Sequence, residues 1–280
     1  MPPTRYTAIP TSTFAAPVSR LMVNLMVLTV LGLSYLLWNH DKIQNIIVEI
    51  KQHNLGVVKT IEGCPLHQPD DANSSFVTFI IPSKGRDSID RTVHSLFNQT
   101  RNLWKAVIVF DGEQRQITSA KAGYLSDPRI TPYTIPKAGK ANFAATLRNY
   151  GMSRVTRSEW FAFVDDDDIL SPEYVSRLLE ETQINTLVET VIFRMSEPRV
   201  LPPRNHVMFQ LGQVGISFAI KRYLFEDGFW FKPSEIEDFN LLKCIFDFNK
   251  KMVISPYVTY YVKGWRPGDL SVEYPRINLN

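Results

Sequence analysis

The sequence has little cysteine. Only two cysteines, Cys64 and Cys244, occur among its 280 residues, and they lie far apart. Two cysteines are too few for a disulfide framework and too few for a zinc site with the usual number of ligands. We expect free thiols, with a single Cys64–Cys244 bridge as the alternative.

The sequence also has little excess charge. Its 31 basic residues nearly balance its 28 acidic ones, so no basic field marks the whole protein as a nucleic-acid binder. No internal repeat or low-complexity tract is visible. The chain has room for one sizeable domain with its own core and an accessory segment, so the function must be sought in local sites.

One long uncharged run is present near the N-terminus. Residues 21–38 are mostly Leu, Val and Met, and as a helix they would extend ~27 Å, close to the thickness of a bilayer's hydrocarbon core. We expect an N-terminal tail at 1–20, a transmembrane signal anchor at 21–38, a stem at 39–75 and the main domain at 76–280. A cleaved signal peptide is the alternative, but the run is longer than a signal core and no small-residue cleavage pattern follows it.

The orientation of this anchor is weakly encoded, because the basic residues on its two sides nearly balance. Two glycosylation sequons, Asn73-Ser74-Ser75 and Asn98-Gln99-Thr100, favour a lumenal main domain, although such triplets also arise by chance. We therefore expect a single-pass membrane protein of type II, with its main domain in the Golgi or ER lumen if the source is eukaryotic.

Apolar runs and helical spacings alternate through the main domain. The expected order is strand 76–81, helix 89–98, strand 105–110, strand 130–135, helix 142–153 and strand 160–164. Such alternation predicts an α/β fold with a mainly parallel central sheet flanked by helices on both faces. Ligands of these sheets gather beyond the carboxyl ends of the strands. The segments at those ends are 82–86, 111–112 and 165–168.

The most unusual of these strand ends is acidic. Asp165, Asp166, Asp167 and Asp168 follow a hydrophobic strand directly, and like charges at this spacing repel unless a cation or hydrogen-bond donors compensate them. A divalent Mg²⁺ or Mn²⁺ ion suits oxygen ligands and neutralises the charge that develops on a departing diphosphate. The alternative is a solvated acidic turn that caps the helix starting near residue 171, a role that Asp168 could fill in part.

The segment Trp160 to Asp168 is similar to the hydrophobic strand and Asp-x-Asp motif of GT-A fold glycosyltransferases. From about Phe76 to Arg266 the chain resembles these enzymes, and it is closest to the inverting family 2 type. The resemblance implies transfer of a sugar from a nucleotide-diphosphate donor, a UDP-sugar, to a glycan, glycoprotein or glycolipid acceptor. It also implies that Asp167 ligates the Mn²⁺ or Mg²⁺ ion and that Asp165, beside the ribose or diphosphate, is a second candidate ligand.

The same resemblance implies a set of donor-binding residues. They are Pro82, Ser83 and Arg86 in the first nucleotide loop, Asp111 at the uracil edge, Arg148, and the acidic residues Asp165 and Asp166. Taken alone, Asp111-Gly112 would be an ordinary tight turn and Arg148 a surface helix residue. Their order along the chain and their position at strand ends favour the donor site.

The resemblance places the catalytic base at the Glu237-Asp238 pair. Displacement at an anomeric carbon requires a group that takes the proton of the incoming hydroxyl, and a correctly placed carboxylate can do so. We assign this role to Asp238, with Glu237 as the alternate; helix capping is the competing interpretation, and one residue can do both.

Residues 260–268 are expected to close over the donor, with Lys263 or Arg266 paired to the diphosphate. The basic and aromatic motif of processive family members is missing, which argues against polymer synthesis. The competing functions are a nucleotidyltransferase, a metal-dependent phosphohydrolase, and a non-catalytic glycosyltransferase-like protein. The first should have a Gly-rich phosphate loop, and Gly85 alone is a poor match.

Overall fold

The computed structural model of the protein describes residues 75–112, 123–142, 144–205, 210–266 and 273–279. The expected tail, membrane anchor and stem, together with Cys64, lie outside these ranges. Cys244 is a free thiol. None of the helices within the described ranges is long and apolar enough to cross a membrane.

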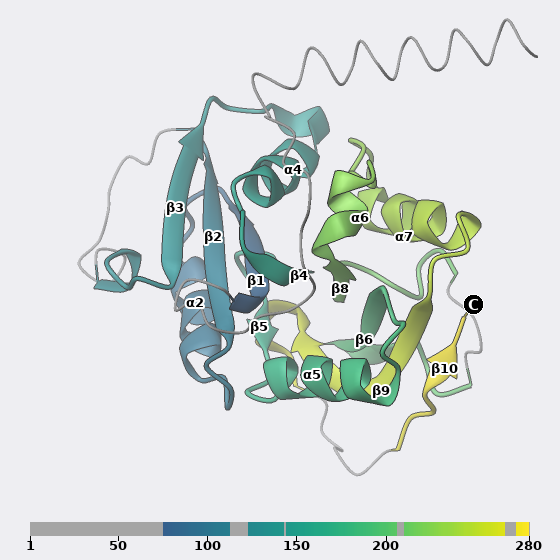
Figure 1. Ribbon diagram of the computed structural model, residues 1–280. Helices are drawn as coiled ribbons and strands as arrows, with labels where there is room; N and C mark the ends of the chain where they lie inside the picture. The colour runs from purple at the N-terminus through teal and green to yellow at the C-terminus, as the bar shows by residue number, and fades with distance from the viewer. Residues whose placement is uncertain (1–74, 113–122, 143, 206–209, 267–272, 280) are drawn as a thin grey trace, which may run out of the picture. The chain divides into compact units, whose positions relative to one another are not determined.

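The described strands form one sheet in the order β10-β9-β6-β8-β4-β1-β2-β3, with β5 paired to β9 and β7 to β6 (Figure 1). The strands are β1 (Ser75–Ser83), β2 (Trp104–Asp111), β3 (Ile130–Ile135), β4 (Ser158–Phe163), β5 (Ile169–Leu170), β6 (Thr190–Glu197), β7 (Arg199–Leu201), β8 (Phe218–Lys221), β9 (Met252–Tyr261) and β10 (Ile277–Asn278). The four strands expected from the sequence are all present, with boundaries shifted by at most two residues.

The sheet is mixed, so the expectation of a mainly parallel sheet is wrong for its C-terminal half. Strands β3, β2, β1 and β4 are parallel neighbours, but β8 runs antiparallel to both β4 and β6. Strand β6 pairs with β9 in parallel, and β10 is antiparallel to β9. The alternation of strands and helices from which the parallel sheet was inferred ends at residue 164, and antiparallel pairs need no helical crossover.

Strand β1 extends through Pro82 to Ser83, two residues beyond the expected end at residue 81. Pro82 pairs with Val109 of β2 and Ser83 with Phe110, whereas pairing with β4 stops at Ile80. Proline has no N–H to donate, so it is tolerated where one side of the strand needs no partner. The first strand therefore delivers Ser83 directly to the carboxyl edge of the sheet.

The described helices are α2 (Ile89–Phe97), α4 (Ala145–Ser153), α5 (Tyr174–Ile184), α6 (Arg222–Glu226) and α7 (Glu237–Asp247), with 3-10 turns η1 (Lys140–Asn142) and η2 (Val262–Gly264). Helix α4 starts three residues later than expected. The side-chain oxygen of Asn142 instead accepts hydrogen bonds from the backbone N–H of Thr146 at 3.1 Å and from its hydroxyl at 2.6 Å. Asn142 thus holds the first turn of α4 from outside the helix.

Helices cover both faces of the sheet, as expected. Gly151 of α4 lies against Ile80 of β1, whereas the ring of the preceding strand residue, Phe79, packs edge-on against Tyr174 of α5 at 5.5 Å. Successive side chains of a strand point to opposite faces, so α4 and α5 lie on opposite sides. Helix α6 joins the α4 side through Phe225, whose ring packs against Phe161.

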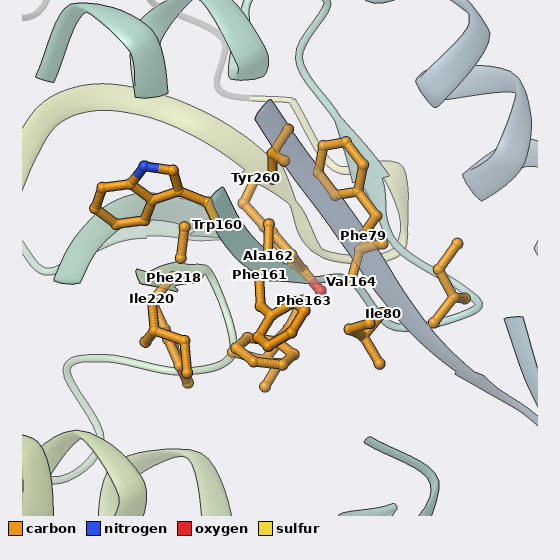
Figure 2. Packing of buried hydrophobic residues seen from close by; sticks show 14 of the residues in the cluster. Phe79, Ile80, Trp160, Phe161, Ala162, Phe163, Val164, Phe218, Ile220 and Tyr260 are labelled. Carbon is orange, nitrogen blue, oxygen red and sulfur yellow. The ribbon is translucent and has the colours of Figure 1, made fainter. Parts of the chain in front are cut away.

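Strand β4 occupies the centre of the core (Figure 2). Residues 160–164 have no exposed surface, and the ring of Phe163 packs against Phe218 at 5.1 Å and against Phe231 at 4.9 Å. Full burial of each large apolar side chain stabilises the fold by about 1.5–3 kcal/mol. The acidic segment that follows, residues 165–168, therefore starts from a rigid position.

Candidate active site

The four aspartates after β4 alternate between outward and inward positions. The side chains of Asp165 and Asp167 are 37% and 25% exposed, whereas that of Asp166 is 4% exposed and Asp168 is buried. The run therefore contains two different pairs of acids. One pair faces the solvent at the carboxyl edge of the sheet, and the other faces the protein.

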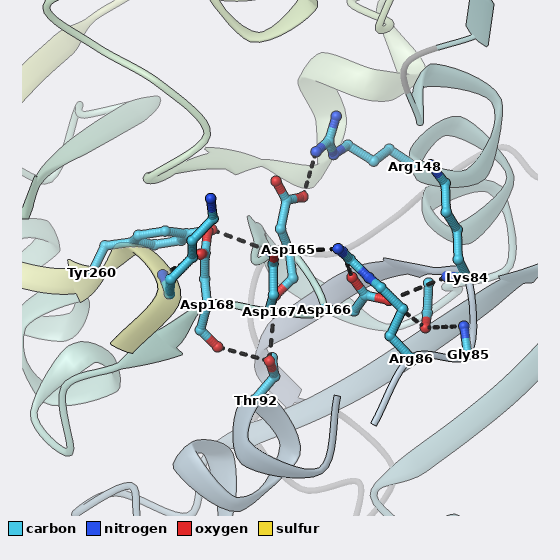
Figure 3. Close-up of polar contacts among 12 residues, drawn as sticks. Lys84, Gly85, Arg86, Thr92, Arg148, Asp165, Asp166, Asp167, Asp168 and Tyr260 are labelled. Atoms are coloured by element: carbon cyan, nitrogen blue, oxygen red, sulfur yellow. Dashed lines mark hydrogen bonds and ion pairs between the residues drawn. The ribbon is translucent and has the colours of Figure 1, made fainter. Parts of the chain in front are cut away.

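Asp166 fastens the acidic segment to the loop after β1. Its Oδ2 accepts hydrogen bonds from the Ser83 hydroxyl at 2.7 Å and from the Lys84 backbone N–H at 3.1 Å, and its Oδ1 pairs with the Arg86 guanidinium (Figure 3). Arg86 also reaches Asp167 Oδ2 at 3.3 Å. The expected donor residues Ser83, Arg86 and Asp166 thus lie together, with Ser83 and Asp166 bonded to each other.

Asp168 fastens the other end of the segment to β9. One of its carboxylate oxygens accepts the Tyr260 hydroxyl at 2.6 Å, and the other accepts the Lys263 backbone N–H at 2.8 Å. Burial and the charge of Asp165 raise the pKa of Asp168 to about 7. With these partners Asp168 does not cap α5, whose N-cap position is Glu173.

Arg148 connects the acidic segment to the start of α7. Its Nη2 lies 2.6 Å from Asp165 Oδ1, and its Nη1 pairs with Glu237 Oε1. Burial alone would lower the pKa of Arg148, but the charges of Asp165 and Glu237 outweigh it and raise the pKa. Three residues predicted as site residues from distant parts of the sequence therefore meet through ion pairs.

The expected Glu-Asp pair opens α7, and its two members differ in burial. Glu237 is 5% exposed, and burial raises its pKa to about 7. Asp238 is half-buried; its Oδ1 accepts the Phe239 backbone N–H at 2.7 Å, and burial raises its pKa. Glu237 is enclosed with Arg148, whereas one oxygen of Asp238 has no hydrogen bond from any described residue. The geometry therefore favours Asp238 as the group that can accept a proton.

The outward acids suit a divalent cation with few protein ligands. Asp165 and Asp167 each pair one oxygen with an arginine, and within the part of the chain that the structure describes no hydrogen bond or ion pair engages the other oxygen. The described residues contain no cluster of three or more His, Cys, Asp or Glu that could hold a metal. Mg²⁺ commonly binds one or two carboxylates together with water and substrate phosphates, so two half-exposed carboxylates fit such an ion.

The remaining predicted residues lie around the same edge of the sheet. Asp111 ends β2, and its Oδ1 accepts the Ala138 backbone N–H at 2.7 Å, while Gly112 turns with a φ of 85°, so the tight turn and a strand-end carboxylate coexist. Pro82 is buried in β1. Lys263 and Arg266 have exposed side chains, and residues 267–272 of the expected closing loop lie outside the described residues.

Several residues that organise the site were not singled out from the sequence. The Tyr260 hydroxyl accepts the Asp165 backbone N–H at 3.1 Å, besides donating to Asp168. The Thr92 hydroxyl donates to the Asp168 carbonyl at 2.7 Å, and the ring of Phe231 lies 5.3 Å from the Arg148 guanidinium carbon. Each sits in an ordinary helix, strand or loop pattern that carries no signal of these contacts.

Two comparisons with solved structures show the fold. The chain resembles S. aureus TarS residues 1–349 in complex with UDP-GlcNAc, with a TM-score of 0.54 and 15% identity over 69% of this chain and 59% of that one. It also resembles the mannosyltransferase PcManGT from Pyrobaculum calidifontis in complex with GDP-Man and Mn²⁺, with a TM-score of 0.51 and 18% identity over 74% of this chain and 62% of that one. The GT-A fold is therefore shared at low sequence identity.

Curated relatives match a shorter region. An uncharacterized glycosyltransferase of Haemophilus influenzae is 26% identical over 110 residues, which cover 39% of this chain and 35% of the relative. Protein CgeD of Bacillus subtilis is 27% identical over 110 residues, which cover 38% of this chain and 26% of the relative. The chain thus spans about a third or less of the length of these relatives.

The family itself is defined by a longer match. The sequence model of glycosyl transferase family 2 matches residues 78–236, which is more than half of the chain and includes most of β1, the acidic segment and Arg148. The chain therefore belongs to glycosyl transferase family 2.

Proposed function

We propose that this chain is a metal-dependent glycosyltransferase that moves a sugar from a nucleotide-diphosphate donor, a UDP-sugar, to an acceptor hydroxyl with inversion at the anomeric carbon. The observation that carries the proposal is the bridge of Arg148 between Asp165 and Glu237. This bridge joins the acids after β4, which would face the donor, to the start of α7, which would face the acceptor.

The chain's own residues divide the chemistry between the two ends of this bridge. The Asp238 carboxylate takes the proton of the acceptor hydroxyl as the acceptor oxygen bonds to the anomeric carbon. The bond from that carbon to the diphosphate oxygen breaks, and the nucleotide diphosphate leaves with the bonding electrons. Exposed Arg86 and Lys263 would supply the cations that pair with the diphosphate oxygens.

Asp165 and Asp167 would hold the Mn²⁺ or Mg²⁺ ion through their outward oxygens. When bound, such an ion neutralises charge on the leaving diphosphate. The mannosyltransferase relative was solved with Mn²⁺ and GDP-Man and the TarS relative with UDP-GlcNAc. These ligands support a nucleotide-sugar donor, and both uridine and guanosine donors have to be tested.

A panel of UDP- and GDP-sugars, each with Mn²⁺ and with a chelator, tests the proposal. We expect release of the nucleotide diphosphate from one donor, dependent on Mn²⁺ and accelerated by a glycan, glycoprotein or glycolipid acceptor. A phosphohydrolase would act equally on the nucleotide diphosphate without a sugar. A nucleotidyltransferase would release no nucleotide diphosphate and, when pyrophosphate is added, would convert the nucleotide sugar to a nucleoside triphosphate and a sugar 1-phosphate. Absence of any release, with the protein folded, would indicate a non-catalytic protein.

We also propose that residues 21–38 anchor the chain in a membrane with residues 76–280 in a lumen. Asn98 of the second sequon is exposed at the C-terminal end of α2, which is a position that a glycan requires. Expression in a eukaryotic cell should give a protein that alkaline carbonate does not extract and that Asn98→Gln shifts to higher mobility. Extraction by carbonate would refute the anchor.

A further inference from the structure

The guanidinium of Arg148 is enclosed between two carboxylate-bearing segments. Arg148 lies in the first turn of α4, and its side chain is 5% exposed. One terminal nitrogen bonds to Asp165 at 2.6 Å and the other pairs with Glu237. The two terminal nitrogens of one planar guanidinium thus bind two segments, the acidic segment after β4 and the start of α7.

This enclosure leaves little surface of Arg148 for a nucleotide, since its side chain is 5% exposed. The ring of Phe231 covers the guanidinium at 5.3 Å, and the buried Nε atom has no hydrogen-bond partner among the described residues. A donor would have to displace Asp165 or Glu237 to reach the charge. The nucleotide contact that the family resemblance implies for Arg148 therefore has no support in this geometry.

The neighbouring residue gives an independent indication that α4 positions the segment before α7. The Asn149 side chain donates to the Phe231 carbonyl at 2.8 Å and accepts the Phe231 backbone N–H at 3.0 Å. Two successive residues of α4 therefore hold, respectively, Glu237 and the loop that leads to it. Helix α4 itself rests on β1 and β2 through Gly151.

The charges around Arg148 require a cation at this place. Asp165, Glu237 and Asp238 each act electrostatically on one another, and Arg148 is the cation that acts on both Glu237 and Asp238. Like charges in a poorly solvated site repel strongly. Without Arg148, repulsion would push the acidic segment and the start of α7 apart.

We propose that Arg148 is a positioning residue that fixes the separation of the donor end and the proton-accepting end of the site by bridging Asp165 and Glu237, without contacting the donor. The role as a positioning residue for transfer rests on the proposed function. The bridge itself does not.

The variant Arg148→Lys distinguishes a bridge between two carboxylates from a contact with the donor's phosphate groups. A lysine ammonium binds phosphate well as a point charge, so Arg148→Lys should retain much of the activity if Arg148 were a donor ligand. An ammonium cannot span two carboxylates in the fork geometry of a guanidinium. The bridge is therefore lost in Arg148→Lys although the positive charge remains.

The first experiment compares Arg148→Lys, Arg148→Met and Arg154→Met. Arg154 directly follows the last residue of the same helix, and its exposed side chain lies over the Tyr150 ring at 4.4 Å, so its replacement is a matched control. We expect both Arg148 variants to bind UDP with Mn²⁺ within about fivefold of the wild-type Kd and to lose at least about 100-fold in kcat on the donor found by the panel. Arg154→Met should match the wild type in both.

Either of two results would overturn the proposal. Recovery of kcat in Arg148→Lys to within about threefold of the wild type would identify a simple charge contact. A loss of UDP affinity as large as the loss of kcat would identify a donor ligand.

The second experiment tests the bridge without any donor. Removal of one partner of a buried ion pair leaves the other charge uncompensated, whereas removal of both can be nearly neutral. We expect the thermal unfolding midpoint of Arg148→Met/Glu237→Gln to lie above that of Arg148→Met alone. Additive destabilisation would refute the bridge, and because no nucleotide is present the result is independent of whether the protein transfers sugars.

Discussion

The hydroxyl of Tyr260 donates to the carboxylate of Asp168 at 2.6 Å and accepts the backbone N–H of Asp165 at 3.1 Å. One phenol on β9 therefore holds both ends of the acidic run. Together with the contacts of Asp166 to the loop after β1, it leaves the carboxylates of Asp165 and Asp167 directed outward.

Asp167→Asn should abolish Mn²⁺-dependent binding of the nucleotide diphosphate. The amide keeps the size of the side chain but removes the charge that a hard cation prefers. Titration calorimetry with UDP, with and without Mn²⁺, measures the effect. The exposed Asp247 at the end of α7 provides the control, and unchanged Mn²⁺-dependent binding in Asp167→Asn would contradict the metal assignment.

Asp238→Asn should leave donor binding intact and lower transfer by at least about 100-fold, because the amide cannot accept the acceptor proton. The measurement is kcat for transfer alongside the Kd for UDP. Glu235→Gln changes a nearby exposed carboxylate and should retain wild-type transfer. Weaker donor binding in Asp238→Asn would show that this residue belongs to the donor site.

The free energy of unfolding should fall as the pH rises from about 4 to about 7 in metal-free buffer. The pKa of Asp168 is raised from 3.8 to about 7 in the folded chain, chiefly by burial. A raised carboxyl pKa means that the folded state binds the extra proton, so its contribution is fully present below the unfolded pKa and is lost as the pH passes about 7. Denaturant titrations at several pH values measure this slope.

Asp168→Asn should flatten that slope, since the amide does not titrate. Tyr260→Phe should extend the fall in stability to higher pH, because the hydroxyl bond to Asp168 lowers the pKa of that carboxyl and its loss would raise the pKa further. An identical slope in the wild type and Asp168→Asn would assign the pH dependence to other groups, such as Glu237.

Gly151→Ala should destabilise the protein by about 1–3 kcal/mol, although alanine favours a helix over glycine by roughly 1 kcal/mol. A Cβ at this position would lie 2.7 Å from Ile80 Cγ2 and 3.2 Å from Val109 Cγ2, so the close packing of α4 on β1 and β2 would have to open. Denaturant unfolding measures the difference. Gly123→Ala, where a Cβ meets no atom within 4 Å, should be neutral or stabilising.

Strands β1, β2 and β4 of the N-terminal half could be predicted because they are almost fully buried and read as apolar runs, whereas β3 is partly exposed. Strand β3 has the expected bounds, and β4 differs from its expected bounds by two residues at one end and one at the other. The direction of β8 could not be predicted, since an apolar run such as Phe218 to Ile220 carries no information about which neighbour it pairs with. The mixed half of the sheet depends on those long-range pairings.

The site was predictable in position but less so in role. The strand-end acids and the start of α7 lie at one edge of the sheet, as the order of motifs suggested. Burial separates Asp166 from Asp167, and Glu237 from Asp238, and neighbouring residues of the same type in the sequence do not reveal which one turns inward. The bridging position of Arg148 depends on three segments that come together only in the folded chain.

Because the four aspartates alternate between outward and inward positions, the role of each one depends on its position in that alternation. Insertion or deletion of one residue between Phe163 and Asp165 would exchange the pair that fastens the segment with the pair that faces outward, while the acidic composition stayed almost the same. The length of that connection is therefore under a tighter constraint than the number of acids that follow it.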